Sequence, residues 1–196
     1  MWCHNLDNGG VPTVVTRVSI DPLREISVGD MVVRRRPVYG ASPRFGMLPN
    51  GRIVFHYGVD YRLTVLDRHG RVEQEIRRGI DAKTVTSQDR EAWLKGQEAR
   101  GALPVVQYEM PFAEKIAVVT GVRTDPSGHI WVRRRGNDAE ERGPIDLMTD
   151  RGRYIGTIVM QELPWAVSMS GLAAYVEEDD NGVESVLVRR LPDAWK

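Results

Sequence analysis

The sequence predicts an all-β protein made of repeated antiparallel units, with one inserted helix. Two observations indicate the strands. Short runs of β-branched, aromatic and leucine residues alternate with glycine-containing turns, and this run-and-turn pattern recurs along the chain. A third observation indicates the helix, because the composition near residues 87–100 changes to that of a capped helix.

The clearest unit spans residues 45–72. Turns at Asn50-Gly51 and His69-Gly70 enclose predicted strands over residues 53–57 and 61–66, and a further strand begins at Val72. Glycine suits these turns because it has no Cβ to clash at positive φ. A short run before the first turn, residues 45–48, completes a four-stranded unit.

Two further copies follow this unit. The second has a turn at residues 125–128, and the third, over residues 168–191, lacks its outermost strand. Gly128 and Gly171 are 43 residues apart, a spacing typical of four-stranded propeller blades. One unit of this size cannot bury its own apolar face, so we expect the units to pack side by side.

The N-terminal part is less regular. Residues 1–11 are polar and end in glycine, which predicts a loose terminus. The runs at residues 13–20 and 24–33 are interpreted as two strands of a unit whose earlier strands are missing, the second run being interrupted at Gly29-Asp30.

The predicted helix separates the first two complete units. Ser87 is the expected N-cap, and Asp89 lies in the first turn, where the helix dipole favours an anion. Trp93 and Leu94 are the expected docking residues. The segment is therefore interpreted as an insertion between two units.

Composition sets limits on the partners. The 196 residues include 27 Lys and Arg and 27 Asp and Glu, so the formal net charge is zero and a nucleic acid or an anionic membrane would need a local basic patch. A single cysteine, Cys3, excludes an intrachain disulfide and a cysteine-based zinc site. No stretch approaches the roughly 20 apolar residues of a membrane span, and no signal peptide is predicted.

The turns and strands together resemble bacterial six-bladed β-propeller proteins of the NHL-like type. The phrase Gly128-His129-Ile130-Trp131-Val132 is especially similar to a strand of that group. The resemblance covers about residues 12–192. It implies one β-propeller-type domain over residues 12–196, with a helical insertion at 86–103, and it implies that complete relatives are exported.

The chain holds about three to three and a half four-stranded units, or about half of a six-bladed ring. We therefore expect a fragment of a longer propeller protein. Two alternatives remain open: a homodimer that completes the ring through unpaired blade edges, or closure of the N-terminal strands on the last unit.

Candidate ligand-binding residues come from the ends of the predicted strands. Arg123 and Trp165 belong to short runs that would face a propeller channel, and His56 and Asp60 would stand at its mouth. The alternative interpretation of His56 and Asp60 is a strand-end histidine and a turn aspartate. By contrast, aromatic residues at corresponding strand positions are expected in the core between units: Phe55, Trp131 and Tyr175.

No catalytic residue, cofactor or metal is predicted. The acidic turn at residues 177–182 could attract calcium, but it lacks the ligand spacing of a calcium loop and is interpreted as a solvated hairpin turn. Arginine runs at residues 34–36, 133–135 and 189–190 could bind RNA. Successive strand residues point to opposite faces, so these runs are interpreted as solvated faces and nucleic acid is not expected as a partner.

The leading hypothesis is a binding or interaction module for an unassigned peptide, glycan or small ligand. One alternative is a propeller hydrolase or lyase of the lactonase type, with a metal at the channel mouth. A second alternative is an RNA-binding surface of the NHL-like type, whose affinity would fall steeply with salt.

Overall fold

A computed structural model describes residues 2–3, 13–14, 23–28, 31–99, 110–136, 142–159, 162–179 and 181–192. Within them the chain is mostly β-structure with one helix, as predicted. The elements in chain order are β1 Trp2–Cys3, β2 Thr13–Val14, β3 Arg24–Val28, β4 Met31–Arg35, β5 Arg44–Met47, β6 Ile53–His56, β7 Arg62–Leu66, β8 Val72–Arg77, α1 Ser87–Ala99, β9 Val119–Thr124, β10 Ile130–Arg135, β11 Arg142–Met148, β12 Tyr154–Ile158, β13 Ala166–Val167, β14 Leu172–Glu178 and β15 Glu184–Arg190.

Three antiparallel meanders account for most strands. The first sheet is β5-β6-β7-β8, the middle sheet is β9-β10-β11-β12, and the last sheet is β13-β14-β15. This confirms the prediction of two four-stranded units and a third that lacks its outermost strand. Two-stranded pairs, β1-β2 and β3-β4, make up the rest.

The N-terminal prediction needs correction. Residues 24–33 do not form one interrupted strand. The break at Gly29-Asp30 separates β3 from β4, which pair antiparallel with each other from Arg24 opposite Arg35 to Val28 opposite Met31. A Gly-Asp pair between two β-rich runs is a hairpin signal, which explains the difference. The predicted loose terminus at residues 1–11 lies outside the described residues except for β1. Residues 15–20 of the run predicted at residues 13–20 also lie outside them.

The same turn closes six hairpins. At Asp125, for example, the N–H of Gly128 donates to the Asp125 carbonyl at 3.0 Å and the N–H of Asp125 donates to the His129 carbonyl at 3.1 Å. The fourth residue of each turn is a glycine with φ between 75° and 88°, which a side chain with a Cβ rarely adopts. These glycines are Gly51, Gly70, Gly128, Gly152, Gly171 and Gly182.

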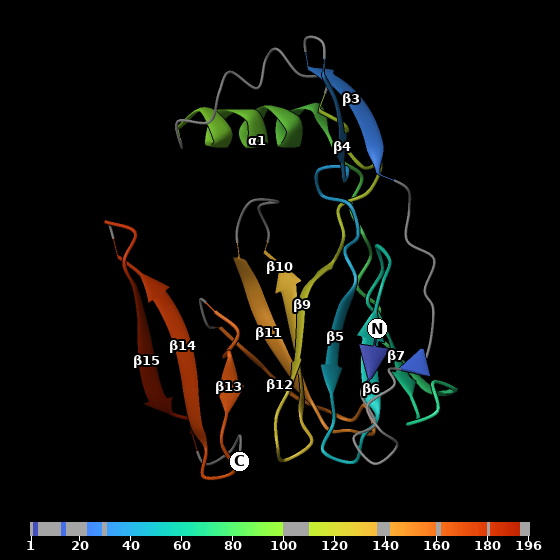
Figure 1. Ribbon diagram of the computed structural model, residues 1–196, viewed down its shortest axis with the longest axis vertical. Helices are drawn as coiled ribbons and strands as arrows, with labels where there is room; N and C mark the ends of the chain where they lie inside the picture. The colour runs from blue at the N-terminus through green and yellow to red at the C-terminus, as the bar shows by residue number, and fades with distance from the viewer. Residues whose placement is uncertain are drawn as a thin grey trace.

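The three sheets lie in a row, with β13-β15 at one end and β5-β8 at the other (Figure 1). One hydrophobic cluster fills the space between the first and middle sheets, and it includes Val54, Leu63 and Ile130. A second cluster fills the space between the middle and last sheets, and it includes Trp131 and Tyr175. The middle sheet is therefore covered on both faces.

Trp131 and Tyr175 thus confirm the predicted core between units, whereas Phe55 does not. Phe55 is only partly buried, because it alternates with Val54 and so lies on the face of the first sheet that turns away from the middle sheet.

Small residues allow the sheets to approach closely. A Cβ added to Gly46 in β5 would lie 2.8 Å from Cγ2 of Thr124 in β9, so the close approach of the two strands requires a glycine here. The Thr124 hydroxyl also donates to the Met47 carbonyl at 2.6 Å. The first strands of the two sheets are therefore joined without an intervening layer of side chains. Ala166, the corresponding residue of β13, is exposed.

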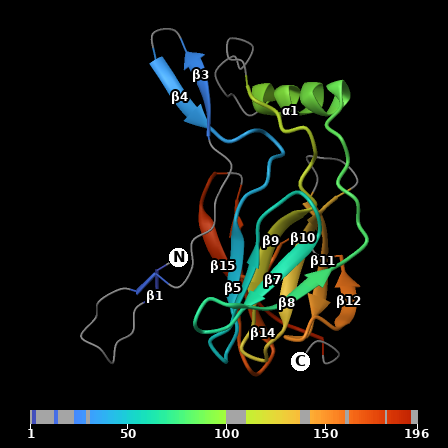
Figure 2. The same cartoon turned by 90° about the vertical axis from the view of Figure 1, so that its right-hand side faces the viewer.

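The helix α1 and the β3-β4 hairpin lie beyond the ends of the sheet strands, at the top of the view (Figure 2). Trp93 docks the helix, as predicted, by an edge-to-face contact with Phe112 at 5.7 Å between ring centroids. The N-cap is Thr86 and not Ser87. The Thr86 hydroxyl accepts from the Asp89 N–H at 3.2 Å, while the Asp89 carboxylate accepts from the Thr86 N–H at 2.8 Å, which forms a capping box. Residues 100–103 of the predicted insertion lie outside the described part.

Candidate functional site

Two of the four predicted site residues meet at the boundary between the middle and last sheets. The Arg123 guanidinium lies over the Trp165 ring, 5.5 Å from the ring centroid. Arg123 belongs to β9, the first strand of the middle sheet, and Trp165 directly precedes β13, the first strand of the last sheet. Trp165 is 65% exposed. An exposed cation–π pair therefore joins two sheets at the surface.

Two more arginines, Arg44 and Arg133, lie close enough to Arg123 for its charge to lower their pKa. Desolvation, followed by the charges of Arg133, Arg123 and Arg36, lowers the pKa of the Arg44 guanidinium. Desolvation and the charge of Arg123 likewise lower the pKa of Arg133. We call Arg44, Arg123, Arg133 and Trp165 the arginine–tryptophan surface.

The positive charge of this surface is only partly neutralised by the protein. Arg133 donates to a Glu162 carboxylate oxygen at 3.0 Å. Arg44 and Arg123 form no ion pair with any described residue, and the Arg123 guanidinium donates only to the Val122 carbonyl at 3.3 Å. Guanidinium groups that repel one another are stabilised by an added anion, which accepts hydrogen bonds from their remaining N–H groups.

The other two predicted residues lie elsewhere. His56 is the cross-strand partner of Arg44, so both side chains lie on the same face of the sheet, but the His56 side chain is buried and does not reach the surface. Its Nδ1 lies 2.8 Å from the Arg62 carbonyl, and its Nε2 has no hydrogen-bond partner in the described part of the chain. Burial lowers the pKa of His56, so the ring is neutral at pH 7. Asp60 is an exposed loop residue whose carbonyl accepts from the Arg62 N–H at 2.9 Å. The structure therefore does not bring His56 and Asp60 onto the arginine–tryptophan surface.

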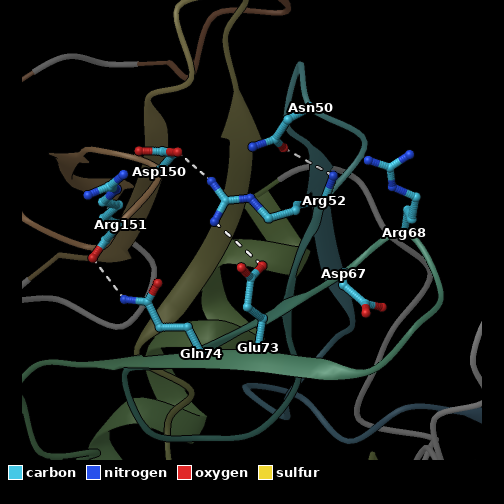
Figure 3. Close-up of a pocket in the computed structure, with 8 residues that line it drawn as sticks. All are labelled: Asn50, Arg52, Asp67, Arg68, Glu73, Gln74, Asp150 and Arg151. Atoms are coloured by element: carbon cyan, nitrogen blue, oxygen red, sulfur yellow. Dashed lines mark hydrogen bonds and ion pairs between the residues drawn. The ribbon is translucent and has the colours of Figure 1, made fainter.

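A polar pocket of about 730 Å³ lies between turns of the first and middle sheets. Figure 3 shows Arg52 at its centre, where the guanidinium donates to Asp150 and lies 3.6 Å from Glu73. Gln74 adds a bond from its Nε2 to the Arg151 carbonyl at 2.8 Å. The eight residues that line the pocket are Asn50, Arg52, Asp67, Arg68, Glu73, Gln74, Asp150 and Arg151. Its central cation already has two acidic partners, so the pocket serves to join the sheets.

One charged group of the interior was not predicted. Asp146 in β11 is 0% exposed and faces the first sheet. It pairs with Arg78 of the first sheet and lies 3.0 Å from Nε of Arg134, and it accepts from the Thr157 hydroxyl at 2.6 Å. The available signal was the position of an aspartate inside the apolar run of residues 145–148, on the face opposite Ile145 and Leu147. This aspartate holds two sheets together through charge.

The second arginine run makes contacts mainly between sheets, whereas Arg34 and Arg189 of the other two runs are exposed, as predicted. Arg133 and Arg134 turn to opposite faces of β10, toward Glu162 and Asp146 respectively. Arg135 lies over the Tyr39 ring at 5.5 Å. The second run therefore divides its charge among three places, which agrees with strand alternation but differs from the solvated faces that we predicted.

The acidic turn at residues 177–182 is organised by a backbone-capping aspartate. The Asp179 carboxylate accepts from the N–H groups of Asn181 and Val183, both at 2.9 Å. Among the described residues, no three His, Cys, Asp or Glu side chains cluster in a way that could hold a metal ion. No helix in this part of the chain is long and apolar enough to cross a membrane.

Comparisons with known proteins add little to these observations. No protein-family model matches the sequence, and no curated protein matches it. A solved structure described as a protein of unknown function from Bacteroides caccae is similar over 81% of this chain, with 12% sequence identity and a TM-score of 0.34. This chain spans 41% of the length of that protein.

Proposed function

We propose that this chain is a binding module of the β-propeller type, and that its arginine–tryptophan surface binds a ligand that carries an anionic group. The propeller arrangement is supported by three consecutive meanders with the same strand order, which pack face to face, and by the contact of β5 with β9, the first strands of two of them. In such an arrangement β5, β9 and β13 line the central channel, and the surface lies along it.

The observation that carries the proposal is the Arg123–Trp165 pair. A guanidinium that contacts an aromatic ring through its face can still donate from its N–H groups to a carboxylate, sulfate or phosphate. Arg44 adds a second guanidinium without an acidic partner among the described residues. The exposed indole offers apolar area beside the charge, which suits a ligand with an anionic group on a larger body.

Binding of RNA by the arginine runs has less support. Arg34 pairs with Glu25 at 2.9 Å, Arg133 pairs with Glu162, and Arg189 pairs with Glu177 at 3.4 Å. Each pair removes a charge that a phosphate backbone would otherwise attract.

The test is a binding titration with sulfated and carboxylated oligosaccharides, with inorganic sulfate, and with a neutral oligosaccharide as the uncharged comparison. We expect Arg123→Gln to weaken binding of the charged probes about tenfold or more, because a hydrogen bond to a charged group contributes about 1.5–3 kcal/mol. The fluorescence change on binding should disappear in Trp165→Phe.

Arg68→Gln is the matched control, because Arg68 is an exposed turn arginine without an ion pair to a described residue and lies at the polar pocket instead. Equal weakening of binding by Arg68→Gln would show that the affinity depends only on the overall charge of the protein. Equal affinity for charged and neutral probes would refute the proposal.

A further inference from the structure

The first and last sheets each expose apolar side chains on the face that points away from the middle sheet. On the last sheet, Val186 is 70% exposed and Val188 is also exposed. Both lie on the face opposite Tyr175, which belongs to the core. On the first sheet, Phe45 is 56% exposed and Met47 is also exposed, on the face opposite Gly46. We call these the outward faces, since they point away from the middle sheet (Figure 1).

The two outward faces are complementary in size. Strand pairing places Ala166, Ala174 and Val188 in one row across the last sheet, next to a row of Val176 and Val186. The corresponding row of the first sheet is Phe45, Phe55, Thr64 and Glu75. The outward face of the last sheet therefore carries alanine and valine side chains, and that of the first sheet carries two phenylalanines, a difference in size that lets packed sheets interdigitate.

The outward faces are also complementary in charge. Glu178 and Glu184 lie directly opposite each other, at the end of the last sheet that is remote from the turn at residues 168–172. Arg62 and Arg77 lie directly opposite each other at the same end of the first sheet. Arg77 is already paired with Glu75 at 2.5 Å, whereas Arg62 has no ion pair with a described residue. Like charges directly opposite on neighbouring strands repel, so each row gains from a face of the other sign.

We infer that a second copy of this chain covers both faces. The last sheet of one copy packs on the first sheet of its partner, and the last sheet of the partner packs on the first sheet of the first copy. Each contact continues the stacking of sheets already present within the chain. The three sheets of one copy and the three sheets of its partner then form one closed ring. Because such a head-to-tail contact closes only if the rotation per sheet is that of a six-bladed ring, the inference rests on the proposed propeller arrangement.

Light scattering during size-exclusion chromatography at several concentrations tests this directly. We expect a mass of twice 22.1 kDa that is constant above the dissociation constant. Val188→Lys places a charge in the contact and should raise the dimer dissociation constant at least tenfold. Val159→Lys is the matched control, because Val159 is 93% exposed, follows β12 of the middle sheet and should leave the dimer unchanged.

Charge exchange provides the second arm. Glu184→Arg and Arg62→Glu should each weaken the dimer about tenfold, and the double variant should return it to within about threefold of the original. Thermal unfolding of the variants at low concentration establishes that the monomer remains folded.

A single-chain mass at every concentration would overturn the inference, and so would equal behaviour of Val188→Lys and Val159→Lys. A mass that grows without a plateau would also overturn it, because it indicates open association in place of a closed pair. Ligand binding is measured separately through Arg123→Gln. Loss of the anion site therefore leaves this result untouched, and loss of the dimer does not remove the anion site from the single chain.

Discussion

Asp146 offers the sharpest test of how the sheets are held together. Asp146→Asn keeps the shape of the side chain and its contact with Thr157, but it removes the negative charge that faces Arg78 and Arg134. Both arginines are mostly buried, so they would be left without a counter-charge in a region of low dielectric constant. Removing one partner of a buried ion pair costs about 3–5 kcal/mol, and we expect a loss of that size in the free energy of unfolding.

Urea denaturation and thermal unfolding measure this loss. For a chain of this length 1 kcal/mol corresponds to roughly 2–4 °C, so the melting temperature should fall by roughly 6–20 °C. Asp150→Asn is the matched comparison, because Asp150 also pairs an arginine of the first sheet with the middle sheet but is 38% exposed. Its loss should be about 1 kcal/mol or less, because the Asp150 carboxylate is partly solvated and Arg52 keeps Glu73, 3.6 Å away, as a second acidic partner.

The reasoning would be refuted if Asp146→Asn cost less than about 1 kcal/mol, or if it cost no more than Asp150→Asn. Either result would mean that water reaches the Asp146 side chain and solvates the two arginines once the carboxylate is gone.

Three further predictions concern packing and pH. Gly46→Ala should lower the free energy of unfolding by about 1–3 kcal/mol, because the new methyl group overlaps Thr124. An unchanged urea midpoint would show that β5 and β9 can move apart without cost. Trp131→Phe should lower the free energy of unfolding by about 1–3 kcal/mol, because the buried Asp125 carboxylate loses the indole N–H that donates to it at 2.9 Å. The double variant Asp125→Asn with Trp131→Phe should lose less than the sum of the two single losses. The lowered pKa of buried His56 means that the unfolded chain binds a proton more readily, so its contribution to stability is complete above about pH 6.5 and is lost as the pH falls toward the pKa of the folded state. Urea midpoints from pH 7.5 to pH 5.5 should therefore fall less steeply in His56→Gln than in the original chain, and equal slopes would contradict this assignment.

The strands and turns could be predicted from the sequence because each depends on residues that are near one another in the chain. The turn at Gly128 needs only its own glycine and the aspartate three residues before it. The helix boundary was placed one residue late because Ser87 and Thr86 both suit an N-cap. Thr86 is the N-cap because Asp89, three residues beyond it, completes a capping box with it.

The candidate site could be predicted only in part. Arg123 and Trp165 were chosen because they belong to short runs that would face a propeller channel, and they meet across a sheet boundary. The environment of His56 and Phe55 could not be predicted, because alternation along a strand gives two faces without saying which one a neighbouring sheet covers. The partners of Asp146 come from distant parts of the chain, so no local pattern identifies them.

The middle sheet differs from its neighbours in being covered on both faces, and this has a consequence for how the protein opens. Units that contact only their neighbours open from the ends of a row, since an end unit loses one interface and a central unit must lose two. Amide deuterium exchange should therefore be slowest in β10, where Ile130, Trp131 and Val132 are completely buried. Exchange in β15 should be fast in a single chain and should slow with rising protein concentration once a partner covers the last sheet.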